Sequence, residues 1–192
     1  MRLVVEKNIR KKKLPSINPK TRKLTPWLRA HLTAHRLEKL HAETQALFGV
    51  SDDQFPSDPS KVFAEPGKTY MGYGPHMGMR DKFLLLVIAK QGPFRQYMEK
   101  YLGRPSVQPQ RWHFVESSSL IYTCTLESDR YPLKHDTALH CALAFNVSQN
   151  LLDGFRSYAY DLPVWIREGF AHWNGRRIDG KKPPSRADVR GG

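Results

Sequence analysis

The stretch of chain that most restricts the fold is an uninterrupted apolar run at residues 83–89, Phe-Leu-Leu-Leu-Val-Ile-Ala. Charged residues precede it, and Lys90-Gln91-Gly92-Pro93 follows it. A run this short, closed by turn-forming residues, is typical of a strand that is buried on both faces, and it is far below the roughly 18 residues of a membrane span. We therefore predict a buried strand here, followed by a helix from Pro93 to near Gly103. A strand of this kind needs covering layers, so the fold must combine a sheet with helices.

A long helix is predicted before this strand, over residues 26–48. Thr25 is placed to cap it, Pro26 occupies the first turn, where a missing N–H costs nothing, and Gly49 follows its end. Apolar residues and one threonine recur at a spacing of three or four, which predicts a core-facing stripe. This stripe consists of Leu37, Leu40, Thr44 and Leu47.

The second half of the chain predicts a hairpin and then two helices. Residues 112–116 and 120–126 are typical of strands joined by a serine-rich turn at 117–119. Helices are expected at about 134–152, ending near Gly154, and at about 162–177, beginning after Asp161. Residues 50–80 are rich in Pro, Gly, Asp and Ser and predict a long irregular connection. The sequence therefore predicts an α+β fold with a small β-sheet, packed helices and two helices at the C-terminal end.

Length and composition predict one domain with two basic ends. The chain has 192 residues, 40% of them apolar, which is enough to bury one core. We expect a basic extended arm over 1–24, a domain over 25–179 and a disordered basic tail over 180–192. No window is apolar and long enough to predict a membrane span.

The formal net charge of +13 raises the question of polyanion binding. No helix-turn-helix, zinc-finger, RNP-type or KH-type pattern is visible, so any such binding is expected to be weak, salt-sensitive and confined to the ends. The basic residues concentrated there are Arg10, Lys11, Lys12, Lys13, Lys20, Arg22 and Lys23 at the start, and Arg176, Arg177, Lys181, Lys182, Arg186 and Arg190 at the finish.

The two cysteines, Cys124 and Cys141, have no metal-ligand spacing and form no disulfide framework. Free cysteine is among the most buried residue types, so two buried thiols are expected. A single bridge between them is the alternative.

Three residues of the last two predicted helices are candidate metal ligands. His140 shares a helical face with apolar residues and is expected to point inward. Glu168 and His172 are four positions apart on the next helix and are therefore neighbours. Imidazole nitrogen and carboxylate oxygen suit zinc, but a buried histidine bonded to a carboxylate is also a stable core feature without metal. We expect no cofactor, with zinc as the alternative.

The segment 162–173, Leu-Pro-Val-Trp-Ile-Arg-Glu-Gly-Phe-Ala-His-Trp, resembles the LPxWLxEGxAxY signature of gluzincin-like, peptidase MA-like domains, including bacterial domains of unknown function. In that family the signature Glu is the third zinc ligand, and a preceding helix carries HExxH, whose histidines bind zinc and whose Glu is the general base. The resemblance assigns the ligand role to Glu168 and the first motif histidine to His140. It implies a zincin-like fold over about residues 25–178.

Two positions depart from that motif. The base position holds Cys141 and the second histidine position holds Ala144. A thiol does not replace a carboxylate base, and alanine supplies no ligand. We therefore expect a catalytically inactive gluzincin-like domain that binds a peptide or protein in the former active-site groove, lined by Trp165, Cys141 and Ala144. The alternatives are a metal-dependent peptidase with an atypical His140/Glu168/His172 site and a basic polyanion- or nucleic-acid-binding module.

A second histidine pair, His31 and His35, also has zincin-like spacing, with Glu38 on roughly the same face. Leu32 stands where the base would be. The three lie roughly opposite the predicted apolar stripe of their helix, so we expect a solvated surface there.

Overall fold

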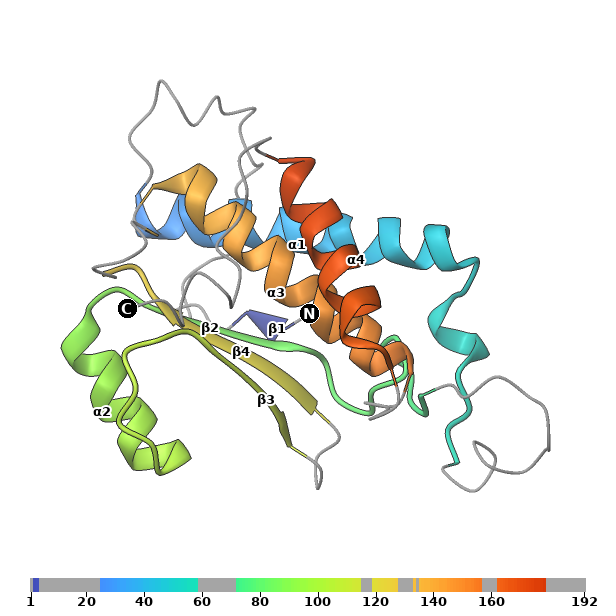
Figure 1. Ribbon diagram of the computed structural model, residues 1–192, viewed down its shortest axis with the longest axis horizontal. Coiled ribbons are helices and arrows are strands. Elements are labelled where there is room, and N and C mark those ends of the chain that lie inside the picture. The colour runs from blue at the N-terminus through green and yellow to red at the C-terminus, as the bar shows by residue number, and fades with distance from the viewer. Residues whose placement is uncertain are drawn as a thin grey trace.

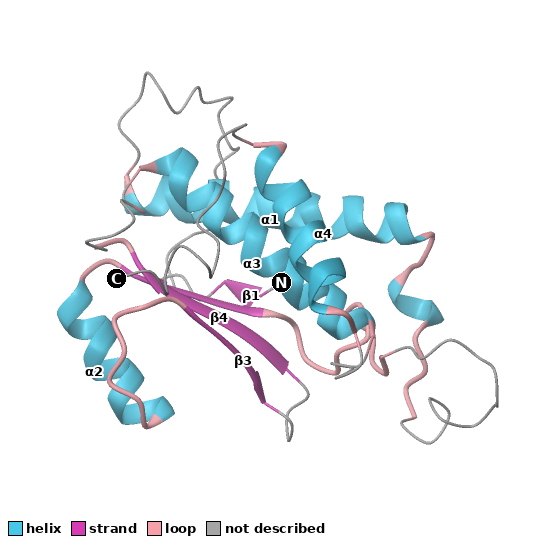
Figure 2. Ribbon diagram, in the orientation of Figure 1, coloured by secondary structure: helices cyan, strands magenta, loops and turns pink. Residues whose placement is uncertain are grey.

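The computed structural model describes residues 2–3, 25–58, 72–114, 119–127, 133, 135–156 and 162–178. Over these ranges the protein has an α+β fold, in which a four-stranded sheet has three helices on one face and one on the other (Figures 1 and 2). Most of the predicted arm and all of the predicted tail lie outside the described residues. Two residues of that arm pair with the sheet, as strand β1 (Arg2–Leu3).

The sheet has the strand order β1-β2-β4-β3. Strand β2 (Leu84–Ile88) is parallel to β1 and to β4 (Ser119–Thr125), while β3 (Gln110–Phe114) is antiparallel to β4. The predicted hairpin is confirmed by this last pairing, although its turn lies outside the described part of the chain.

Strand β2 is covered on both faces but is less buried than its sequence predicts. Leu85 is buried, whereas the other four residues of the strand are half-buried. In the described part of the chain the far face carries one helix, α2 (Gln91–Leu102), which buries Phe94 and Met98. A single short helix covers a sheet face incompletely, which explains the difference.

Helix α1 (Pro26–Phe48) begins and ends as predicted. The Thr25 hydroxyl accepts a hydrogen bond from the Leu28 amide at 3.2 Å, and Gly49 closes the helix in the left-handed conformation, with φ of 64°. Leu37, Leu40 and Thr44 are buried, but Leu47 is 55% exposed. The prediction for Leu47 is wrong because Phe48, and not Leu47, packs against the core in the last turn of α1.

Helices α3 (Asp136–Phe155) and α4 (Val164–Arg176) also match their predicted positions. Helix α3 lies against the sheet and is buried along most of its length, between β4 and helices α1 and α4 (Figure 1). The main core combines it with β2, β4 and α1. No helix of the described chain is long and apolar enough to cross a membrane.

Part of the predicted irregular connection docks on the C-terminal end of α3. The Gly72 amide donates a hydrogen bond to the Phe155 carbonyl at 2.8 Å. A Cβ at Gly72 or at Gly78 would collide with the carbonyl oxygen of Gly154, and Gly78 also has a φ of +85°. Glycine is therefore required at both positions for the chain to approach the helix so closely.

Candidate functional site

Helices α3 and α4 are antiparallel, and three contacts fix their register. Cys141 Sγ lies 3.8 Å from the Gly175 carbonyl oxygen, and the rings of Phe145 and His172 are 5.0 Å apart between centroids. Further along α3, Gln149 Nε2 donates a hydrogen bond to Glu168 Oε1 at 3.4 Å. Glu168 therefore lies opposite Gln149.

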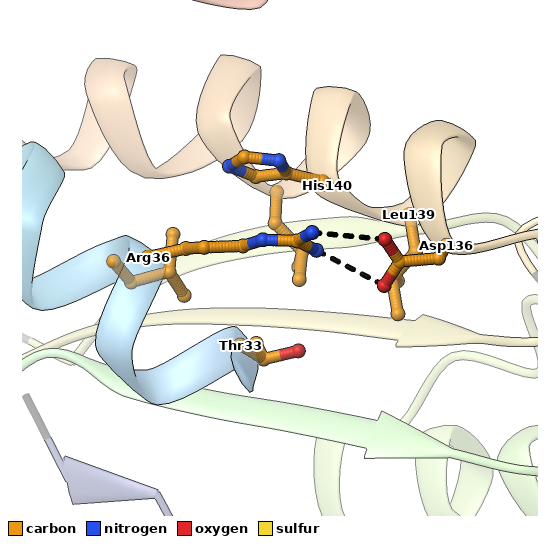
Figure 3. Close-up of a pocket in the computed structure, with 7 residues that line it drawn as sticks. Thr33, Arg36, Asp136, Leu139 and His140 are labelled. Atoms are coloured by element: carbon orange, nitrogen blue, oxygen red, sulfur yellow. Dashed lines mark hydrogen bonds and ion pairs between the residues drawn. The ribbon is translucent and has the colours of Figure 1, made fainter. Parts of the chain in front are cut away.

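His140 lies elsewhere on α3. It is nine positions before Gln149, which corresponds to about 13 Å along the axis and about half a turn around it. Its ring faces α1, where it shares a narrow crevice with Thr33, Arg36 and Asp136 (Figure 3). The structure therefore separates His140 from Glu168.

The crevice contains a bidentate ion pair. Arg36 Nη1 and Nη2 donate to Asp136 Oδ1 and Oδ2 at 3.0 and 2.9 Å, and both side chains are mostly buried. Burial, reinforced by the positive charge of Arg36 and opposed by Asp136, lowers the pKa of His140 to about 4. At neutral pH this imidazole is uncharged.

The three predicted metal ligands are not brought together. Glu168 contacts Gln149, His172 packs against Phe145, and His140 faces α1. Within the described ranges there is no group of three or more His, Cys, Asp or Glu side chains arranged to hold a metal ion. As arranged, these residues do not fit a zinc ion, which needs its ligands at about 2 Å from one centre.

A larger cavity opens where α1, α3 and the C-terminal end of α4 meet. Its volume is about 350 Å³. Apolar side chains of all three segments form part of its wall, and cationic side chains line it as well. The lining residues are Leu32, His35, Arg36, Leu37, Lys39, Leu40 and Glu43 of α1, His140 and Ala144 of α3, and Asn174, Arg177 and Ile178 at the end of α4. We call this cavity the three-helix pocket.

Of the three predicted groove residues, only Ala144 lines the three-helix pocket. Cys141 directly follows His140 in α3, and its side chain points toward the α4 backbone at Gly175. Trp165 lies in the first turn of α4, far along that helix from the pocket, and is 75% exposed. The antiparallel register brings the end of α4, rather than its beginning, to His140, so Cys141 and Trp165 lie outside this pocket.

The rim of the pocket carries more positive than negative charge. Glu43 forms ion pairs with both Lys39, at 3.7 Å, and Arg177, at 3.2 Å. One carboxylate thus serves two cations, and both of them are substantially solvent-exposed. This arrangement favours an additional carboxylate at the rim.

A second buried charge cluster lies between β3, α3 and α4. Asp153, with a 2% exposed side chain, accepts from Arg111 at 2.7 Å and from Arg167 at 3.4 Å. Asn150 also accepts from Arg111, at 2.9 Å. These contacts fix the sheet against the two helices and explain why α3 can bury a carboxylate.

The remaining chemical candidates have simpler environments. Cys124 and Cys141 are both buried and form no disulfide with each other, as predicted, and burial raises the pKa of Cys124 to about 12. His35 and Glu38 are exposed as expected, but His31 is half-buried and its ring lies 4.1 Å from that of Trp27. Because Trp27 lies one turn before His31 in the helix, the sequence could have predicted this contact.

Sequence reasoning missed Arg36, Asp136 and Arg177. No short motif joins them, since Arg36 and Asp136 are a hundred positions apart. The chain matches no protein-family model, no curated protein and no solved structure.

Proposed function

We propose that this chain is a zincin-like domain without peptidase activity that binds a peptide segment in the three-helix pocket. The observation that carries the proposal is the pocket itself, because it lies against His140 and Ala144, where the resemblance would place the first active-site helix. Its volume of about 350 Å³ is within the range of ligand sites. Its mixed apolar and cationic lining suits a peptide side chain together with a carboxylate.

The surroundings of His140 support binding rather than hydrolysis. Activation of a water for peptide hydrolysis needs a base with a free lone pair within about 3 Å of that water. The carboxylate facing His140, Asp136, is held in a bidentate ion pair with Arg36, and the low pKa of His140 makes its imidazole a weak base. Glu168 lies on the opposite side of α3, where it accepts from Gln149.

The experiment is a selection of random displayed peptides on the immobilised protein, followed by isothermal titration with the selected peptides. Ala144→Leu fills the wall of the pocket, and Lys39→Gln removes a rim charge. Both variants should weaken binding while the thermal transition persists. Lys100→Gln on α2, across the sheet, is the matched control and should bind normally. Equal binding by all variants, or no selected peptide, contradicts the proposal.

A further inference from the structure

We infer that the peptide site continues from the three-helix pocket past Arg177 onto the outer face of α4, and that it selects a segment carrying a carboxylate close to an aromatic or aliphatic side chain. This inference rests on the proposed function and names its ligand class. The first observation is that Arg177 lines two cavities. One is the three-helix pocket, and the other is an open groove of about 440 Å³ lined by Gly169, His172, Trp173 and Arg176.

The second groove offers open space beside an exposed aromatic side chain, Trp173. A Cβ at Gly169 would meet nothing within 4 Å, so the helix surface there is open. Trp173 stands beside it, stacked on Phe170 at 6.2 Å between ring centroids, and remains 48% exposed. Gly169 and Trp173 are one turn apart and share a face, which leaves room for an apolar side chain against the indole.

The same side of the molecule carries further exposed apolar residues. Trp165 is one turn before Gly169 on this face and is 75% exposed. Leu47 follows Glu43 by one turn on α1, and Trp173 precedes Arg177 by one turn on α4. Because Glu43 and Arg177 form an ion pair, Leu47 and Trp173 lie on the same side of the contact between the two helices. Exposed apolar residues gathered on one side of a protein in this way mark a candidate interaction surface.

The positive charge around the two cavities favours an acidic occupant. Arg177 lies at the junction of the two cavities, 4.8 Å from the Trp173 ring centroid, and its Nη1 contacts Glu43. Arg176 lines the outer groove as well, so the guanidinium groups of Arg176 and Arg177 both border a ligand bound there. A carboxylate bound there would complete the pairing of these guanidinium groups. A second copy of this chain, whose net charge is +13, would bring like charges together instead.

The concave shape of the site favours a peptide over a lipid surface as its occupant. Side chains of a peptide can enter the two cavities, whereas a flat bilayer reaches only the protruding tryptophans. The inference therefore commits to an acidic, apolar-anchored peptide.

The test uses the peptides selected on the full chain. The inference expects enrichment of Asp or Glu within two positions of Trp, Phe or Leu. Trp173→Ala and Arg177→Gln should each weaken the best synthetic peptide about tenfold, as expected of a central contact. Arg95→Gln, which removes the same charge from α2, is the control and should leave the affinity unchanged.

Different outcomes separate the two proposals. If Lys39→Gln and Ala144→Leu weaken binding but Trp173→Ala and Arg177→Gln do not, the proposed function stands and this inference is overturned. Enrichment of basic or purely polar peptides also overturns it. The inference is also overturned if the protein binds vesicles of phosphatidylcholine and phosphatidylserine more tightly than any selected peptide, and if that binding depends on Trp173. If the affinity is insensitive to Lys39 and Ala144, the proposed function itself fails.

Discussion

Arg36 of α1 and Asp136 of α3 are joined by two parallel hydrogen bonds of 3.0 and 2.9 Å, with side chains that are 19% and 12% exposed. This pair ties the first turn of α3 to the middle of α1 (Figure 3). It also places a guanidinium beside the ring of His140. One contact therefore both holds the walls of the proposed site together and sets its electrostatics.

Asp136→Asn should lower the free energy of unfolding by about 2–3 kcal/mol, because it leaves the mostly buried Arg36 guanidinium without its counter-charge. Urea denaturation measures this value directly. Glu99→Gln on the exposed side of α2 is the matched control, with an expected change below about 0.5 kcal/mol. An effect of Asp136→Asn as small as that of the control would show that the pair is only a surface contact.

His140 should titrate with a pKa of about 4, which is measurable from its ring proton shifts by NMR. Since the folded-state pKa is below the unfolded value of about 6.5, the unfolded chain binds the proton first. The contribution of His140 to stability is therefore complete above about pH 6.5 and is lost as the pH falls toward 4. Arg36→Gln should raise this pKa. The stability of His140→Gln should fall less steeply across that interval, and a normal titration near 6.5 would contradict the assigned burial.

The fold was largely predictable from local patterns. The ends of α1 follow from Thr25, Pro26 and Gly49, because capping depends on residues adjacent in sequence. The exposure of Leu47 was not predictable, since the neighbouring Phe48 takes the core contacts of that turn, against the rings of Phe155 and Phe170. Spacing along a helix shows which residues share a face but not which part of that face finds a neighbour.

Gly72→Ala and Gly78→Ala should each destabilise the fold by at least about 2 kcal/mol, since the new methyl group meets the Gly154 carbonyl. Gly92→Ala is the control, because it lies in the first turn of α2 with open space around it. It should be neutral or stabilising by up to about 1 kcal/mol. Thermal and urea unfolding distinguish the two classes, and equal effects at Gly72 and Gly92 would rule out the close approach.

The candidate site was less predictable than the fold. The sequence indicated that His140 borders a functional region, but its partners were assigned by assuming that His140 and Glu168 face each other. The register of α3 against α4 is set by long-range packing, and it pairs Glu168 with Gln149. Arg36 and Arg177 enter the site from segments distant in sequence, which no local pattern indicates.

Rebuilding the peptidase motif should destabilise the fold at both of its positions. Cys141 is buried with its Sγ facing the Gly175 carbonyl, so Cys141→Glu places a carboxylate against an acceptor and should cost about 3 kcal/mol. Ala144 is 2% exposed and belongs to the main core, so Ala144→His overpacks it and should cost about 1–3 kcal/mol. The double variant should show no zinc-dependent casein hydrolysis. Hydrolysis that is lost on Glu168→Ala would instead mean that a working site assembles.

The most direct test of the account is a titration of the isotope-labelled protein with a selected peptide, followed by mass spectrometry of the same sample with zinc added. The account predicts amide shift changes concentrated at residues 32–43, 140–144 and 169–178, with the peptide recovered intact. Shift changes confined to the sheet or to α2 would contradict the proposed site, and cleavage of the peptide would contradict the proposed loss of catalysis.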